Sequence, residues 1–371
     1  MLKNLYGDKR VARSQVELNA ILSSHERYVA SRGGARAQLA HALLDGLLLA
    51  NRNLKEADFS GASLVGASLH GSNLEYASLY CADLRDCDLR STRLTRADLR
   101  GASFRGARLS HAVLDNADLR AAMMMYVGDG GVSVVDRAAQ GSATGVDFSN
   151  CSMKGASFGN ARLDGANFNG ALLTGASFKN ARLANASFKN AVLTGVSLKE
   201  LDVPADAIAG SVTDVTPEAA AKFERLKQLL DAHQQWIAGG GSAGAPANFD
   251  NQDLRPLHKL LIGRPLGGLS ARGAICIGLD FSGCQLQAAK LDGADLRDAD
   301  FTDADLRGAS LRGARLAHAR FERTNLGRLA LSNGTFLAPD LREVDAVEEQ
   351  FHRATLEDRL ADLGLAKSNS A

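Results

Sequence analysis

Residues 77–99 read ASLYCADLRDCDLRSTRLTRADL, with a leucine at every fifth position. The same fifth-position series of Leu or Phe runs unbroken over 54–119. It returns over 148–198, where Met153 is the one exception, and over 281–331. The three runs contain 14, 11 and 11 repeats. A period of five is neither the 3.6 of a helix nor the 2 of a flat strand. It predicts a chain that turns a corner every five residues and stacks its large side chains in one column.

A small residue, usually alanine, precedes each large residue by two positions, and the other three positions are mostly Asp, Asn, Ser, Arg, Lys and Gly. We expect the large and the small residue to point inward, because together they fill a narrow shaft without voids. The other three face water, and successive coils lie about 4.8 Å apart. Repeats of this kind form solenoids in which each unit contacts only its neighbours.

These motifs resemble the pentapeptide-repeat proteins, whose consensus is A-[D/N]-L-x-x. The consensus is present at Ala57-Asp58-Phe59, Ala82-Asp83-Leu84, Ala97-Asp98-Leu99, Ala166-Asn167-Phe168, Ala294-Asp295-Leu296 and Ala304-Asp305-Leu306. The resemblance implies an all-β solenoid, a right-handed quadrilateral β-helix with four pentapeptides in each coil. The repeats would then make about nine coils, on the order of 43 Å of stacked backbone.

The composition points to neither a nucleic acid nor a membrane. The net charge is +1, from 43 basic and 42 acidic residues, so no overall field attracts DNA or an anionic surface. No apolar run approaches the ~20 residues that cross a bilayer, and the start MLKNLYGDKR has no signal-peptide core. We therefore expect a cytoplasmic protein.

The cysteines follow the repeat. Cys87, Cys151 and Cys284 occupy the small inward position, and Cys276 occupies the large one. We interpret them as buried fillers of the core and not as a disulfide framework or metal ligands.

The chain is also duplicated on a larger scale. The apolar pattern of 18–29 recurs 208 residues later over 226–237, and in both copies it marks one face of a helix. Thr216 followed by Pro217 is a good start for the second helix. We expect each helix to cover the first coil of the β-helix that follows it, because an open solenoid end exposes unpaired backbone groups.

The predicted organisation is therefore two tandem halves, each an α-helix followed by a β-helix, with an α-helix at the C-terminus. The segments are 1–38 (N-terminal helix and hinge), 39–203 (first β-helix), 204–248 (linker and second helix), 249–338 (second β-helix) and 339–371 (C-terminal helix and tail).

Three stretches break the five-residue pattern. Met124 and Phe148 are 24 residues apart, so the phase slips and an inserted loop is predicted over about 126–145. Residues 203–215 are predicted to leave the ladder and link the halves. Residues 340–367 carry alternating charges around apolar positions, which predicts an amphipathic helix. That helix would pack on the last coil or pair with a second copy as a homodimer.

We assign no residue to catalysis, to a cofactor or to a metal. The strongest candidates are His25, which precedes Glu26, and His233, but no second histidine follows at i+4, so the HExxH zinc spacing is absent. We interpret each histidine as part of the inner stripe of its helix, hydrogen-bonded to the first coil. The glycine-rich stretches 128–131 and 239–244 do not form a GxxxxGK[ST] phosphate loop.

The sequence therefore favours a non-enzymatic bacterial scaffold or adaptor that binds protein partners through the faces of its solenoids. The resemblance adds an alternative, because some pentapeptide-repeat proteins mimic B-form DNA and protect type II topoisomerases such as gyrase. Charge argues against it: residues 52–122 carry ten basic and nine acidic side chains, and a duplex mimic needs an acidic face. DNA binding by the arginine-rich stretch 90–108 is also disfavoured, because aspartates are interleaved with the arginines and aromatic stacking partners are almost missing.

Two substitutions test which residues face inward. Leu84→Lys is expected to unfold its half of the chain, because a buried unpaired charge costs more than the ~1.5–3 kcal/mol that a buried Leu contributes. Arg100→Ser should change the free energy of unfolding little, because Arg100 faces water. Urea unfolding followed by circular dichroism measures both variants. A large loss of folded protein in Arg100→Ser would show that inside and outside are exchanged.

Overall fold

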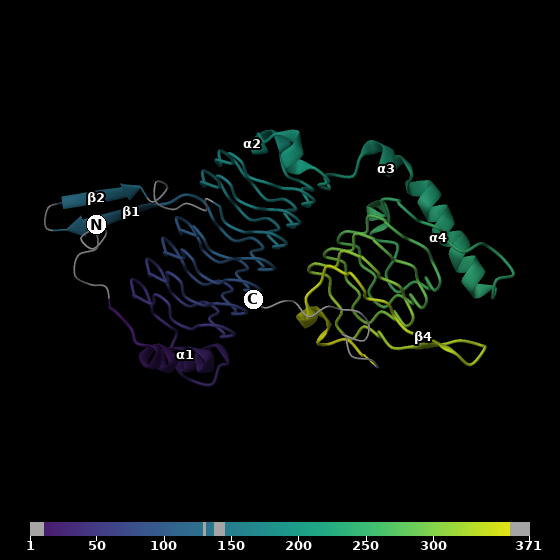
Figure 1. The fold of residues 1–371 in the computed structure, drawn as a ribbon, viewed down its shortest axis with the longest axis horizontal. Helices are drawn as coiled ribbons and strands as arrows, with labels where there is room; N and C mark the ends of the chain where they lie inside the picture. The colour runs from purple at the N-terminus through teal and green to yellow at the C-terminus, as the bar shows by residue number, and fades with distance from the viewer. Residues whose placement is uncertain (1–10, 129–130, 137–144, 357–371) are drawn as a thin grey trace. The chain divides into compact units, whose positions relative to one another are not determined.

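The computed structural model describes residues 11–128, 131–136 and 145–356. The chain forms two compact units, unit 1 (Met1–Asp214) and unit 2 (Val215–Ala371), and each is a stack of coils (Figure 1). The fold is the predicted β-helical solenoid.

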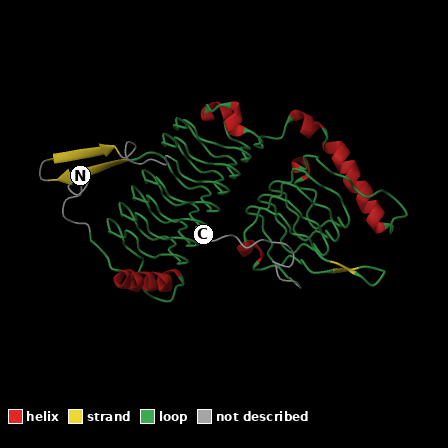
Figure 2. Ribbon diagram, in the orientation of Figure 1, coloured by secondary structure: helices red, strands yellow, loops and turns green. Residues whose placement is uncertain are grey.

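The backbone of unit 1 returns to the same side every twenty residues and pairs with itself in parallel. The paired residues are those just before each large residue, so that Asp58, Ser78 and Asp98 form one ladder. Each contact is an isolated bridge of single residues, and the coils are therefore drawn as loops in Figure 2. Four ladders make four faces: face 1 lies along 38–177, face 2 along 43–182, face 3 along 48–187 and face 4 along 53–212.

Backbone hydrogen bonds join each coil to both neighbours. The N–H of Leu84 donates to the carbonyl of Ser103 in the next coil (2.8 Å), and the N–H of Asp83 donates to the carbonyl of Ala62 in the previous one (2.9 Å). The same two bonds recur along the coils, so buried backbone groups find partners without long strands.

The large residues form the predicted column. They are buried throughout 54–119, 148–193 and 281–326. Leu198 and Leu331, which end the second and third predicted runs, are instead 45% and 40% exposed. The prediction is wrong for these two because the chain has left the coil at both positions, into a helix at Leu198 and beside a hairpin at Leu331.

Phenylalanine rings fill part of each column. On face 3, Phe148 stacks on Phe168 (5.1 Å between ring centroids) and Phe168 stacks on Phe188 (4.7 Å). Phe158 and Phe178 stack in the same way on the opposite face 1 and meet Phe168 edge to face. Stacking along a face and edge-to-face contact across the shaft are both favourable aromatic geometries.

Two hairpins are inserted between coils. Strands β1 (Met123–Gly128) and β2 (Gly131–Asp136) pair antiparallel, and the ladder spacing across them is 39 residues, from Arg108 to Asp147. The hairpin overlaps the loop predicted over 126–145 but begins three residues before it, at Met123. Residues 129–130 and 137–144 of that loop lie outside the described part. In unit 2, β3 (Leu329–Ala330) and β4 (Phe336–Leu337) pair antiparallel in the same manner.

Unit 1 extends further than predicted. After α2 (Leu198–Leu201) and the 3-10 helix η1 (Ala205–Ile208), the carbonyls of Ala207 and Val212 still accept hydrogen bonds from the preceding coil, each at 2.7 Å. The prediction that 203–215 leaves the ladder is therefore wrong as far as Val212. Val203 and Ile208 continue the five-residue phase and pack against the core of unit 1, but the helical segments α2 and η1 interrupt the regular repeat around them.

Helices precede both stacks. Helix α1 (Gln15–Val29) lies at the start of unit 1 and begins with a capping box between Ser14 and Glu17. In unit 2, α3 (Pro217–Ala221) and α4 (Phe223–Ala238) come first, with Thr216 as the N-cap of α3. The first coil of unit 2 includes η2 (Arg255–Leu257), and its ladder spacing is 22 residues, from Asn248 to Ser270.

The C-terminal helix predicted from Asp340 onward is wrong for the described residues. Asp340, Asp345 and Thr355 pair in parallel with the preceding coil, and the one helical turn there is η3 (Glu348–Phe351). The ring of Phe351 is buried and lies 4.6 Å from that of Phe321. Residues 340–355 are thus another coil, and the part of the prediction over 357–371 lies outside the described residues.

Corner glycines offer a test of how neighbouring coils fit. Gly155 and Gly175 occupy the same corner in successive coils, with φ of +66° and +68°. A Cβ on Gly155 would lie 2.6 Å from Oδ1 of Asn116, whereas a Cβ on Gly175 would meet nothing within 4 Å. Gly175→Ala should cost about 1–2 kcal/mol from the left-handed backbone alone. Gly155→Ala should cost about 1 kcal/mol more, because the Asn116 amide must rotate away.

Urea unfolding of both variants and of the double variant Asn116→Gly/Gly155→Ala measures the difference. The double variant should remove the extra cost, since glycine tolerates the left-handed φ of residue 116. Equal costs for the two alanine variants would contradict the proposed contact.

Candidate functional site

The two candidate histidines lie where the helices meet the first coil of each unit. Nδ1 of His25 accepts the N–H of Ala37 (3.1 Å), and Nδ1 of His233 accepts the N–H of Ala247 (3.0 Å). Both side chains are fully buried. Burial is the main reason why the pKa of each imidazole is lowered from its ordinary value of 6.5. The predicted hydrogen bond to the first coil is confirmed, and the histidines act as acceptors for an otherwise open edge.

Other side chains of α1 pair with the same edge. The amide of Gln15 donates to the carbonyl of Leu48 (2.9 Å) and accepts its N–H (2.8 Å), as a neighbouring strand would. The carboxylate of Glu26 accepts two hydrogen bonds from Arg52, at 2.7 and 3.0 Å. Helix α1 therefore replaces the missing previous coil and protects the edge from pairing with another chain.

The faces of the coils carry a repeated ion pair that the sequence interpretation missed; it is buried at Asp295–Arg297 and at least partly exposed elsewhere. In the tripeptide Asp-Leu-Arg, the Asp and Arg side chains project from the same side of the strand. Nε and Nη2 of the guanidinium each donate a hydrogen bond to the carboxylate. We call this arrangement a fork. Every Asp-Leu-Arg tripeptide in the sequence forms one: Asp83–Arg85, Asp88–Arg90, Asp98–Arg100, Asp118–Arg120, Asp253–Arg255, Asp295–Arg297, Asp305–Arg307 and Asp340–Arg342.

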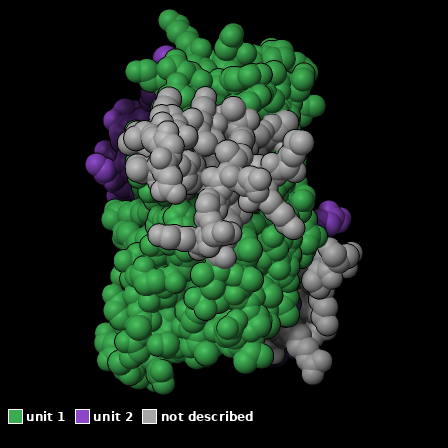
Figure 3. All heavy atoms as spheres, turned by 90° about the vertical axis from the view of Figure 1, so that its left-hand side faces the viewer, with its two compact units in different colours: residues 1–214 green, residues 215–371 purple. Residues whose placement is uncertain are grey.

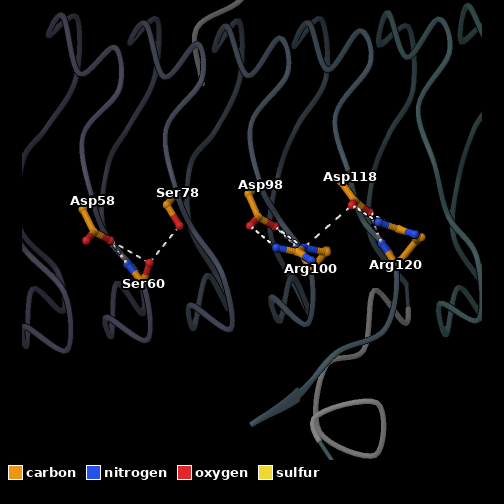
Figure 4. A network of polar contacts seen from close by, with 7 residues as sticks. All are labelled: Asp58, Ser60, Ser78, Asp98, Arg100, Asp118 and Arg120. Atoms are coloured by element: carbon orange, nitrogen blue, oxygen red, sulfur yellow. Dashed lines mark hydrogen bonds and ion pairs between the residues drawn. The ribbon is translucent and has the colours of Figure 1, made fainter.

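Face 1 shows how forks join successive coils (Figure 4). Arg100 holds both oxygens of Asp98 (2.8 and 2.7 Å), and its Nε lies 3.7 Å from Oδ2 of Asp118 in the next coil. Asp118 is held in turn by Arg120. The ladder alone would set like charges about 5 Å apart, which is destabilising. The arginines turn this repulsion into a chain of alternating charge.

The forks also fix the charge state of the carboxylates. Hydrogen bonds from Arg90 hold the pKa of Asp88 below its ordinary 3.8, and those from Arg342 do the same for Asp340. A carboxylate with a lowered pKa stabilises the fold above its unfolded pKa, and this contribution is lost as the pH falls through the folded pKa. The faces therefore remain ionised and internally neutralised near neutral pH.

The cysteines provide no nucleophile. All five are free and buried. The thiol of Cys87 donates to the carbonyl of Leu64 (2.8 Å), and that of Cys151 donates to the carbonyl of Leu109 (2.8 Å). Burial raises the pKa of Cys87 to about 12 and that of Cys284 to about 11, so neither forms a reactive thiolate near neutral pH.

Among the residues that the structure describes, no group of three His, Cys, Asp or Glu side chains is placed to hold a metal ion. No helix in this part of the chain has the length and apolar character needed to cross a bilayer.

The solved structures to which this chain is similar include HetL, QnrB1 and a further Nostoc protein. HetL, involved in heterocyst differentiation regulation in Nostoc sp. strain PCC 7120, is 22% identical, with 86% of this chain and 98% of that chain covered and a TM-score of 0.28. QnrB1, a plasmid-mediated fluoroquinolone resistance protein, is 20% identical, covering 52% and 92%, with a TM-score of 0.22. Another pentapeptide repeat protein of Nostoc PCC 7120 is 32% identical, covering 30% and 84%, with a TM-score of 0.17.

No curated protein matches the chain in sequence. The family model for pentapeptide repeats matches it over residues 53–91, 92–125, 144–180, 171–203, 270–303, 280–317 and 299–336. These matches cover more than half of the chain and fall on the coils of both units. The chain therefore belongs to the pentapeptide-repeat family.

Proposed function

We propose that the protein is a non-enzymatic cytoplasmic scaffold or adaptor that binds a protein partner through the faces of its β-helices. The observation that carries the proposal is the fork, because it makes long faces that are charged but internally neutralised. Such a face presents regularly spaced hydrogen-bonding groups to a partner without a strong field of one sign. Figure 3 shows the side of unit 1 as an elongated block of closely packed atoms.

The faces differ in ways that a partner could recognise. The forks of unit 1 all lie in 83–120, whereas the later coils carry lysines such as Lys179 and Lys189 with no fork. Both lysines are exposed. Within the described residues neither has a carboxylate at ion-pair distance, so both are available to a partner. Complementary charge at such an interface contributes specificity and association rate more than affinity.

The DNA-mimic alternative gains no support from the geometry. A mimic of the duplex must present uncompensated carboxylates to an enzyme that binds phosphates. Here aspartates that face outward, such as Asp88 and Asp98, are held by arginines of the same face. Arg108 adds a second cation to Asp88 at 3.2 Å.

A tryptophan scan around one coil tests the proposal. Residues 174, 179, 184 and 189 are the outward positions just after the large residue on faces 4, 1, 2 and 3, and all four are exposed. Each is replaced by Trp in the full-length chain, which then captures partners from an extract of its native cell. One substitution should abolish capture of a given partner while the other three retain it, because only one face is blocked.

The matching positions in unit 2 are 272, 277, 282 and 287, which serve the same purpose if the partner binds there. Circular dichroism confirms that each variant is folded. Capture that survives all eight substitutions would rule out binding through a face.

The same preparations are added to a gyrase supercoiling reaction with and without a quinolone, where we expect no change. Protection of gyrase would favour the alternative.

A further inference from the structure

We propose that the helices α1 and α4 are acid-released caps: each stays on its first coil while His25 or His233 is neutral, and detaches when that imidazole is protonated. The proposal goes beyond the scaffold function and does not depend on it. Its basis is one contact built twice, at equivalent places in the two units.

The hydrogen bond defines the protonation state. Nδ1 accepts a backbone N–H in both histidines, so it carries no proton and the ring is the neutral tautomer with its proton on Nε2. Nε2 of both rings is buried and has no hydrogen-bond partner among the described residues. The backbone of Lys55 raises the pKa of His25, and that of Leu266 raises the pKa of His233; both offset only part of the effect of burial.

A second proton cannot be accommodated in this position. It would bind Nδ1, which faces the N–H of Ala37 or Ala247 at about 3 Å, so two donors would oppose each other. It would also place a charge on a fully buried ring, which is costly without a paired anion. The protonated ring must therefore leave its pocket, and the helix that carries it moves with it.

The charged groups around each ring do not rescue the cation. Around His25, Glu26 of α1 and Glu56 of the coil favour protonation, whereas Arg36 and, above all, burial oppose it, so the pKa is lowered. Glu26 is already held by Arg52, whose bonds lower the pKa of that carboxyl.

No charged side chain is among the causes that shift the pKa of His233. Asp231 of α4 and Arg264 of the coil lie 3.9 Å apart and pair with one another. Burial is again the largest cause of the lowered pKa. Both caps therefore hold their histidine in the neutral form.

The two contacts arise from different local sequences. His25 reaches forward twelve residues to Ala37, and His233 reaches fourteen to Ala247. An aromatic residue stacks on each ring from the same helix, Tyr28 at 6.1 Å and Trp236 at 5.6 Å. The same hydrogen bond forms in both units although the connecting loops differ in length. It therefore belongs to the way the helix packs on the first coil and not to one particular loop.

The direction of the pH effect follows from linkage. Each histidine has a folded pKa below its unfolded value of 6.5, so the unfolded or released helix binds more protons at mildly acidic pH. The cap is fully stabilised above pH 6.5 and loses stability as the pH falls from there through the folded pKa. A released helix of 15 or 16 residues is marginal in water, so its amides should exchange.

Hydrogen–deuterium exchange of the full-length protein at about pH 7.5 and about pH 5 tests the proposal. Rates are divided by the intrinsic rate at each pH. Protection of 15–29, 223–238, Ala37 and Ala247 should fall by up to about tenfold for each pH unit between 6.5 and the folded pKa and level off below it, while inner-coil amides such as Leu84 stay protected. Equal protection of the helices at both values would overturn the proposal.

His25→Gln and His233→Gln separate the caps from general acid destabilisation. A glutamine Oε1 can accept the same N–H but does not titrate. In His25→Gln the protection of α1 should no longer depend on pH, whatever its absolute level, while the protection of α4 still falls at acidic pH. In His233→Gln the protection of α4 should be independent of pH and that of α1 should still fall. His41→Gln, at an exposed corner, should leave both responses intact. A pH response of α1 that persists in His25→Gln would contradict the assignment.

Discussion

The return of the backbone every twenty residues is the constraint from which the rest of this protein follows. Because each coil takes its hydrogen bonds from the coils before and after it, the chain needs no long strand and no second sheet. The same return places equivalent residues in register along a face, so leucine meets leucine inside and aspartate meets aspartate or serine outside. It also leaves two open ends on every stack. The column of side chains, the ion pairs and the capping helices are three responses to this one repeat.

The fork answers the electrostatic problem that the repeat creates. Like charges in a ladder would repel from coil to coil, but an arginine two residues after the aspartate lies on the same face and satisfies it locally. Each exposed pair contributes only about 0.2–1 kcal/mol. Its larger effect is on surface character, because acidic ladders become neutral ones. The count of charges in the sequence showed that acidic and basic residues balance, which argued against a DNA mimic. It did not show that they neutralise one another in pairs on the same face.

The sequence predicts the coils well because burial of a leucine every fifth residue has one simple geometric solution. It predicts the interruptions poorly, since an insertion shifts the frame in which the pattern is visible. Leu341, Ala346, Phe351 and Leu356 continue the five-residue series, but the β3–β4 hairpin precedes them and alternating charges suggested a helix. The forks could have been found, because the tripeptide Asp-Leu-Arg is their complete signal. The histidine contacts could be expected only in outline, since they depend on loops of unequal length.

The structure also indicates where specificity can reside. Inward residues and corners are set by packing. In 83–120, eight of the outward residues are paired in four forks, and replacing one member of a fork removes its ion pair. The coils over 148–198 have no fork, and side chains such as Thr174, Lys179 and Ala184 can change there without breaking an ion pair. Substitutions that adapt those coils to a partner should cost little stability, whereas substitutions at the fork residues of 83–120 would break ion pairs. The last coils of unit 1 are therefore the part of this unit that recognition can shape most freely.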